Sequence, residues 1–200
     1  MSVSRLKKLF RVLYYYVFAH IILLFHYEKK YITQRWFYSG KYKGINALGW
    51  KWVVDDYCLC KRMRVNKDCP WPASPNCRIT PSYENIVFDP SDLNNFQGSG
   101  CVFQTYGRIE IGKGTYIANN VGIITVNHKL DNLDEHMPVE NVRIGSCCWI
   151  GMNAMILPGV VLGDHTIVGA GAVVTKSFEK GNCVIAGNPA RIIKELIIQD

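Results

Sequence analysis

The sequence IGSCCWIGMNAMILPGVVLGDHTIVGAGAVV, residues 144–174, has an aliphatic residue at every sixth position. An α-helix repeats every 3.6 residues and a strand every two, so a period of six fits neither element alone. It fits short strands that are joined by tight corners and stacked in parallel, with three hexads in each turn. The aliphatic residues are Ile144, Ile150, Ile156, Leu162, Val168 and Val174, and an earlier run has Ile111, Ile117 and Ile123.

Small residues accompany the aliphatic ones. Glycine follows directly in Ile144-Gly145 and Leu162-Gly163, where it lets the backbone turn while the aliphatic side chain points into a narrow interior. A β-sandwich whose strands match this spacing by coincidence is the alternative. Nine hexads in register favour a parallel β-solenoid of the all-β class.

This pattern resembles that of the hexapeptide-repeat acyltransferases over residues 85–196. The closing sequences GAGAVVTKSF (169–178) and CVIAGNPARIIKEL (183–196) resemble the galactoside, maltose and serine acetyltransferase branch. LGWKWVVDDYCLCK (48–61) and PWPASP (70–75) resemble the capsule and lipopolysaccharide O-acetyltransferases. The resemblance implies a left-handed parallel β-helix, a homotrimer, acetyl-CoA as the acyl donor, and a hydroxyl group of a sugar or of a cell-surface polysaccharide precursor as the acceptor.

We therefore expect three regions in the chain. Residues 1–32 form a basic, apolar helical segment, and residues 33–84 form an irregular cap. Residues 85–196 form the left-handed β-helix acyltransferase domain.

A loop must leave the coil between Ile123 and Ile144, because the 21 positions that separate them are not a multiple of six. We place this loop at residues 128–143, so that His128 stands at its start. Hexapeptide-repeat acyltransferases carry their catalytic histidine at such a junction. The resemblance therefore implies that His128 is the general base that takes the proton from the acceptor hydroxyl. A solvated loop histidine is the alternative.

The same loop also contains His136 and three carboxylates, one of which could orient the imidazole of His128. The sequence leaves open which of the three does so. The cysteines of the repeat region lie away from this loop, so we expect direct acyl transfer without a covalent acyl-enzyme. The three carboxylates are those of Asp131, Asp134 and Glu135.

The resemblance also implies which residues meet coenzyme A. Ala118 and Ala170 match positions along which the pantetheine arm runs, and Trp149 matches an aromatic residue beside the pantetheine or the acceptor. Subunit packing would explain an exposed Trp149 equally well. Cations that follow the last full coil would bind the 3′-phosphate and the pyrophosphate of coenzyme A. The alternative for each cation is a charge that only meets solvent. These candidates are Lys176 and Lys194, which match the family residue by residue, Arg191, which is supported by position alone, and Thr175 beside them.

The positive charge of the chain is concentrated near its N-terminus. Residues 1–67 contain 14 Lys and Arg against 3 Asp and Glu, whereas residues 68–200 contain 9 against 13. An uncharged apolar run at residues 12–27 predicts a helix of about 24 Å, which is shorter than the hydrocarbon core of a bilayer. No small-residue cleavage site follows, so we expect the segment to remain on the mature protein.

Interleaved apolar and basic residues suit an anionic membrane surface better than a nucleic acid. We therefore expect peripheral membrane contact through residues 4–30, in a cytoplasmic protein that attaches at the cytoplasmic face of the inner membrane. A helix that packs on its own protein or on a sister subunit is the alternative.

The chain has eight cysteines, and reduced thiols are the simplest interpretation. A zinc site among the cysteines at positions 58–77 is conceivable, but the C-x-x-C pairs of such sites are missing and we expect no metal. Two other functions stay open. One is a zinc-dependent enzyme like carbonic anhydrase, which requires three converging histidines, and the other is a trimeric scaffold without catalytic activity.

Overall fold

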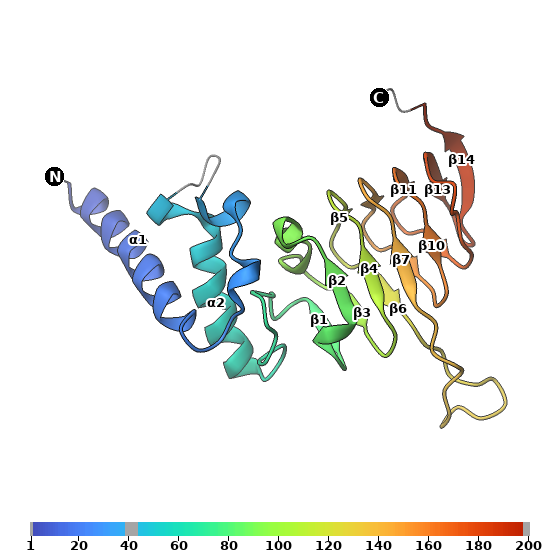
Figure 1. Ribbon diagram of the computed structural model, residues 1–200, viewed down its shortest axis with the longest axis horizontal. Helices are drawn as coiled ribbons and strands as arrows, with labels where there is room; N and C mark the ends of the chain where they lie inside the picture. The colour runs from blue at the N-terminus through green and yellow to red at the C-terminus, as the bar shows by residue number, and fades with distance from the viewer. Residues whose placement is uncertain (1, 39–43, 198–200) are drawn as a thin grey trace. The chain divides into compact units, whose positions relative to one another are not determined.

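The computed structural model describes residues 2–38 and 44–197 of the 200-residue chain (Figure 1). The chain divides into two compact units, Met1–Pro75 and Asn76–Asp200. Each unit has its own hydrophobic core, and each is described by itself below.

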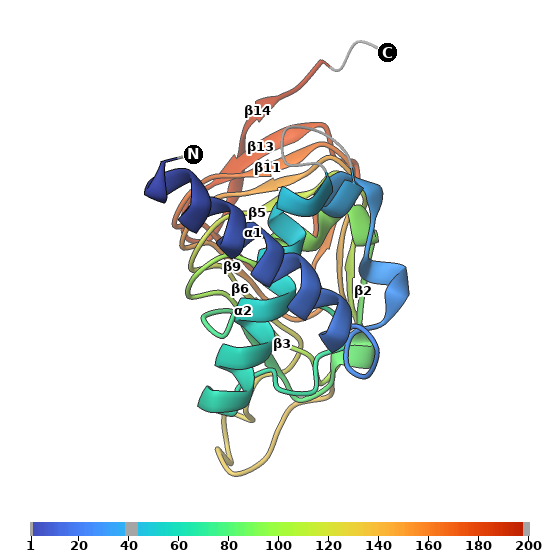
Figure 2. The same cartoon turned by 90° about the vertical axis from the view of Figure 1, so that its left-hand side faces the viewer.

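The first unit is helical. Two α-helices pack against each other, α1 (Val3–Ile22) and α2 (Leu48–Met63), as Figure 2 shows. The side chain of Ser2 caps α1 by accepting a hydrogen bond from the Arg5 amide at 3.4 Å. Trp50 and Trp71 are almost fully buried in the core of this unit. Shorter helical turns are η1 (Lys29–Tyr31), η2 (Gln34–Tyr38) and η4 (Gly44–Asn46).

The helix α2 lies within residues 33–84, for which the sequence predicted an irregular cap. That prediction was wrong for residues 48–63. Trp50, Val53, Val54 and Cys60 recur at helical spacing and are all buried, so one apolar side of α2 packs into the core of the unit. Among the described residues, no helix is long and apolar enough to cross a membrane.

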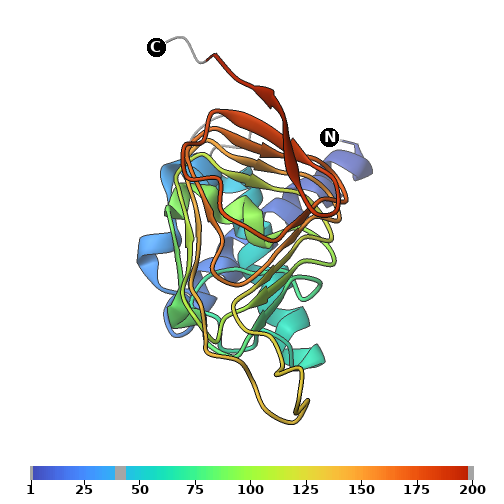
Figure 3. The ribbon, with the colours of Figure 1, turned by 90° about the vertical axis from the view of Figure 1, so that its right-hand side faces the viewer.

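The second unit consists of short strands arranged in three sheets (Figure 1). Sheet A has the order β1-β3-β6-β9-β12, sheet B has β2-β4-β7-β10, and sheet C has β5-β8-β11-β13-β14. Successive strands such as β4, β5 and β6 lie in sheets B, C and A, so the chain winds through all three sheets once per coil (Figure 3). All pairs are parallel except β13 with β14, which is antiparallel.

The strands of this unit and two short helical turns have the following bounds. They are β1 (Arg78–Thr80), η5 (Tyr83–Asn85), β2 (Ile86–Phe88), η6 (Pro90–Phe96), β3 (Val102–Gln104), β4 (Ile109–Ile111), β5 (Tyr116–Ile117), β6 (Gly122–Ile124), β7 (Val142–Ile144), β8 (Trp149–Ile150), β9 (Met155–Ile156), β10 (Val161–Leu162), β11 (Thr166–Val168), β12 (Val173–Val174), β13 (Cys183–Ala186) and β14 (Arg191–Glu195).

The aliphatic residues of the hexads form the core of the coil. The strand register places Ile117 next to Ile150 and Ile150 next to Val168 in sheet C, and it pairs Ile123 with Ile156 in sheet A. All nine predicted hexad positions are buried. The prediction of short parallel strands stacked around a narrow apolar interior is confirmed for this unit.

In seven of the nine hexads, the third residue after the aliphatic one has a left-handed backbone. Cys147, Asn153 and His165 have φ values of 54°, 62° and 56° at the corners of the coil. Gly159 and Gly171 occupy the equivalent corners, and glycine adopts this conformation without the clash that a Cβ brings. His165 is therefore a corner residue of the coil.

The ends of the coil differ from the predicted limits. The first strand begins at Arg78 instead of residue 85, and Ile79 pairs with Phe103 of β3. At the other end, β14 pairs antiparallel with β13 and continues sheet C to residue 195. The predicted loop at residues 128–143 is also displaced, because β6 ends at Ile124 and because Val142 and Arg143 belong to β7.

Candidate active site

The candidate base His128 lies in an excursion, residues 125–141, that leaves sheet A after β6 and rejoins the coil at β7 (Figure 1). The side-chain oxygen of Gln104 accepts hydrogen bonds from the amides of Thr125 and Val126, both at 3.2 Å. At the far end, the side chain of Asn141 accepts a hydrogen bond from the Arg108 amide at 2.8 Å. Both ends of the excursion are thus fixed to the coil.

The excursion folds back on itself as a hairpin. The amide of Met137 donates to the carbonyl of Asn127 at 2.8 Å, and the amide of Lys129 donates to the carbonyl of Glu135 at 2.9 Å. Lys129 and Glu135 also form an ion pair. These contacts lie on either side of His128 and hold its backbone in place.

The Nδ1 atom of His128 lies 2.7 Å from the carbonyl oxygen of Leu133. A carbonyl oxygen only accepts hydrogen bonds, so this contact favours the tautomer with its proton on Nδ1. Nε2 then keeps its lone pair and can accept a proton. The sequence suggested a loop carboxylate as the group that orients the ring, whereas the structure gives this contact to the main chain.

Two further rings stack beside His128. The ring of His136 lies 4.5 Å from that of His128, and the ring of Tyr106 lies 5.7 Å from that of His136. The sequence placed His136 in the loop, but it gave no sign of Tyr106. Tyr106 follows β3 and His128 follows the neighbouring strand β6, so the coil register would have indicated this proximity.

Five of the predicted coenzyme A residues lie along sheet C. Ala118 follows β5 and Ala170 follows β11, at the same corner of the coil with the β8 coil between them. The Ala118 amide donates to the carbonyl of Ile150 at 3.0 Å. Trp149 lies in β8 and is 56% exposed. Arg191 and Lys194 lie in β14, at the opposite edge of sheet C from β5.

Thr175 and Lys176 lie elsewhere, at the corner that follows β12 in sheet A. Lys176 lines a cavity of about 260 Å³ together with Ile192 and Glu195 of β14. Its Nζ atom lies 5.7 Å from the ring centre of Phe178. The described residues of one chain therefore do not bring all seven coenzyme A candidates and His128 to a single corner.

Comparison with known proteins identifies the repeat. Residues 141–176 match the family model of the bacterial transferase hexapeptide, six repeats. The resemblance to the hexapeptide-repeat acyltransferases, which the sequence suggested, is thereby confirmed for this part of the chain.

Relatives in sequence include two proteins of Escherichia coli (strain K12). Galactoside O-acetyltransferase is 36% identical over 95 residues, which cover 46% of this chain and 46% of that protein. Putative colanic acid biosynthesis acetyltransferase WcaF is 36% identical over 125 residues, which cover 62% of this chain and 65% of that protein. The matched part thus spans about half to two thirds of these relatives' own length.

One similar solved structure is that of a galactoside acetyltransferase in complex with coenzyme A. It is 31% identical to this chain and has a TM-score of 0.45. The match covers 48% of this chain and 50% of that chain.

Burial raises the pKa of the thiols of Cys148 and Cys183 within the repeats, so neither is a ready thiolate. In the part of the chain that the structure describes, no group of three or more His, Cys, Asp or Glu side chains could hold a metal ion. In the described part of the chain, His128 thus offers an imidazole whose Nε2 could take a proton.

Proposed function

We propose that this protein transfers an acetyl group from acetyl-CoA to a hydroxyl group of a sugar or of a cell-surface polysaccharide precursor, with His128 as the general base. The observation that carries the proposal is the contact between Nδ1 of His128 and the carbonyl of Leu133, which leaves Nε2 as the acceptor. The hexapeptide repeats and the names of the relatives support acetyl transfer.

The reaction proceeds by direct attack. As the acceptor oxygen bonds to the thioester carbonyl carbon, Nε2 of His128 takes the proton of the hydroxyl group. Backbone amides stabilise the negative charge on the tetrahedral intermediate. The carbon–sulfur bond then breaks, and the departing sulfur of coenzyme A takes the proton back from the imidazolium. The acetyl ester and free coenzyme A are the products.

Direct transfer agrees with the surroundings of the cysteines. Cys148 and Cys183 are buried, and burial raises the pKa of both thiols. Cys147 is exposed, but it lies at the corner that leads into β8, whereas His128 follows β6. An acyl-enzyme would need a nucleophile within hydrogen-bond reach of the base.

We further propose that the coil is left-handed and that three chains form a homotrimer. In one chain His128 follows sheet A, whereas Ala118 and Trp149 lie along sheet C. Packing of parallel triangular coils around a three-fold axis would bring a corner of one chain against a face of the next. The base and the coenzyme A site would then meet between subunits.

The first experiment is a screen of acceptors. Acetyl-CoA is incubated with the protein and a panel of nucleotide sugars and lipid-linked glycans, and the release of free thiol is followed. Mass spectrometry then identifies the acetylated product. The proposal predicts thiol release that depends on one class of sugar acceptor. A trimer that binds coenzyme A but acetylates no member of the panel would favour the scaffold instead.

A further inference from the structure

The helix α1 exposes its apolar side to solvent. Its only buried residues are Ala19 and Ile22, on the side that packs against α2. Leu6, Phe10 and Val17 share the opposite side by helical spacing, and Phe10 is 63% exposed. Large apolar residues exposed along α1 are Val3, Leu6, Leu9, Phe10, Leu13, Tyr14, Val17, Phe18 and Ile21.

This outward side, which we call the apolar stripe (Leu6, Phe10, Leu13, Val17 and Ile21), runs almost the whole length of α1. A helix at the surface of a water-soluble protein normally presents polar residues there. A continuous apolar surface of this kind marks a site of contact with a membrane or another protein. The charges around the stripe indicate which of the two it is.

The first 27 residues contain no Asp or Glu. Four cations lie in the first three turns of α1, with Arg5 and Lys7 flanking the apolar stripe by helical spacing and Lys8 on the far side: Arg5, Lys7, Lys8 and Arg11. Cations near a helix N-terminus oppose the helix dipole, so they do not serve to stabilise α1 itself. A second copy of this helix would bring further cations and no carboxylate to pair with them. An external surface that carries negative charge would complement the cations that flank the stripe.

We infer that α1 lies flat on a membrane that contains anionic phospholipids, with its apolar stripe among the acyl chains and with Arg5 and Lys7 at the phosphates. A helix of 20 residues extends for about 30 Å, so the whole stripe can lie along the membrane surface. The inference does not depend on acyl transfer, because it rests on the first unit alone.

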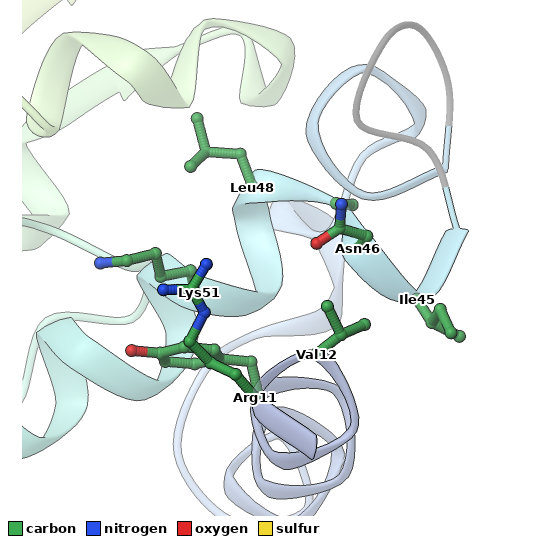
Figure 4. Close-up of a pocket in the computed structure, with 8 residues that line it drawn as sticks. Arg11, Val12, Ile45, Asn46, Leu48 and Lys51 are labelled. Atoms are coloured by element: carbon green, nitrogen blue, oxygen red, sulfur yellow. The ribbon is translucent and has the colours of Figure 1, made fainter. Parts of the chain in front are cut away.

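A cavity lies on the other side of α1, between this helix, η4 and α2. It has a volume of about 260 Å³ and is lined by Arg11 and Val12 of α1, Ile45 of η4, and Leu48 and Lys51 of α2, among others. Figure 4 shows Arg11 and Lys51 at one side of it and Val12 and Ile45 at the other. Lys51 is already paired with Asp55, and the cavity faces away from the apolar stripe, so it takes no part in the proposed membrane contact.

The first test is flotation of the full-length protein with vesicles of phosphatidylcholine alone or mixed with phosphatidylglycerol. We expect binding to the mixed vesicles and little binding to the neutral ones. Phe10→Asp and Val17→Asp should each lower the bound fraction by about tenfold, because each places a charge in the acyl region. The matched control is Leu59→Asp, at an exposed apolar position of α2, which should bind like the parent.

The second test removes charge. Arg5→Gln and Lys7→Gln should each weaken binding to the mixed vesicles by about fivefold, and salt should weaken it further. Arg62→Gln, in the last turn of α2, is the control and should have no effect. Circular dichroism verifies that every variant keeps its helices.

Two results would overturn the inference. The first is equal binding of the parent to neutral and anionic vesicles, or binding to neither. The second is a smaller assembly for Phe10→Asp in the absence of vesicles, measured by mass photometry, which would make the apolar stripe an interface between subunits.

Discussion

The imidazole of His128 is oriented by main-chain atoms of its own loop. Nδ1 contacts the carbonyl of Leu133, and the hairpin that contains both residues is closed by the Lys129–Glu135 pair. The position of the histidine could be predicted, because the break in the six-residue spacing places it at a junction. Its orientation could not, since a contact with a carbonyl depends on the turn at Asn132 and not on any residue type.

The carboxylates of the loop should therefore matter little for catalysis. Asp131→Asn and Asp134→Asn should each leave kcat within about threefold of the parent, because the carbonyl of Leu133 keeps its contact with Nδ1. Acetyl transfer is measured by thiol release at saturating acceptor. A loss of a hundredfold in either variant would mean that a carboxylate orients the ring in the assembled enzyme.

At the scale of elements, the sequence predicts the coil where one aliphatic residue repeats without interruption. The register of Ile117, Ile150 and Val168 in sheet C agrees with that spacing. The first coil was not predicted, because β1 contributes a single aliphatic residue to the core, Ile79, and its partner Phe103 is aromatic. The helix α2 was not predicted, because its tryptophans and its adjacent aspartates hide the helical spacing of the buried residues.

The stacked aliphatic side chains predict a large loss of stability when one of them is shortened to alanine. Ile150 is fully buried between Ile117 and Val168, so Ile150→Ala should lower the free energy of unfolding by about 2–5 kcal/mol. Val102→Ala removes a half-exposed side chain of β3 and should cost less than about 1 kcal/mol. Urea denaturation of both variants measures the difference. Equal losses would contradict the assignment of the hexad aliphatics to the core.

At the scale of the whole molecule, the separation of the candidate residues supports the proposal that assembly completes the site. Ala118, Trp149 and Ala170 lie along sheet C, and His128 extends from the corner after sheet A. The resemblance to hexapeptide-repeat acyltransferases implied all of these residues, but no pattern in one chain indicates which surfaces of two chains meet. The unit of residues 1–75 adds the apolar stripe of α1, a surface that the coil does not need for its own fold.

Assembly and activity should therefore change together. Mass photometry should show three copies of the 22.7 kDa chain, and dilution below the assembly threshold should abolish acetyl transfer. A monomer that retains full activity would show that the site is complete within one chain.

The measurement that tests the central proposal most directly is the kcat of His128→Ala. Loss of a general base should lower kcat by about a hundred- to ten-thousandfold, while coenzyme A affinity and assembly stay close to those of the parent. The matched control is His165→Asn, because asparagine suits the left-handed corner at which that histidine lies, and it should keep kcat within about threefold. If His128→Ala instead retains kcat within about threefold of the parent, His128 is not the base of this reaction.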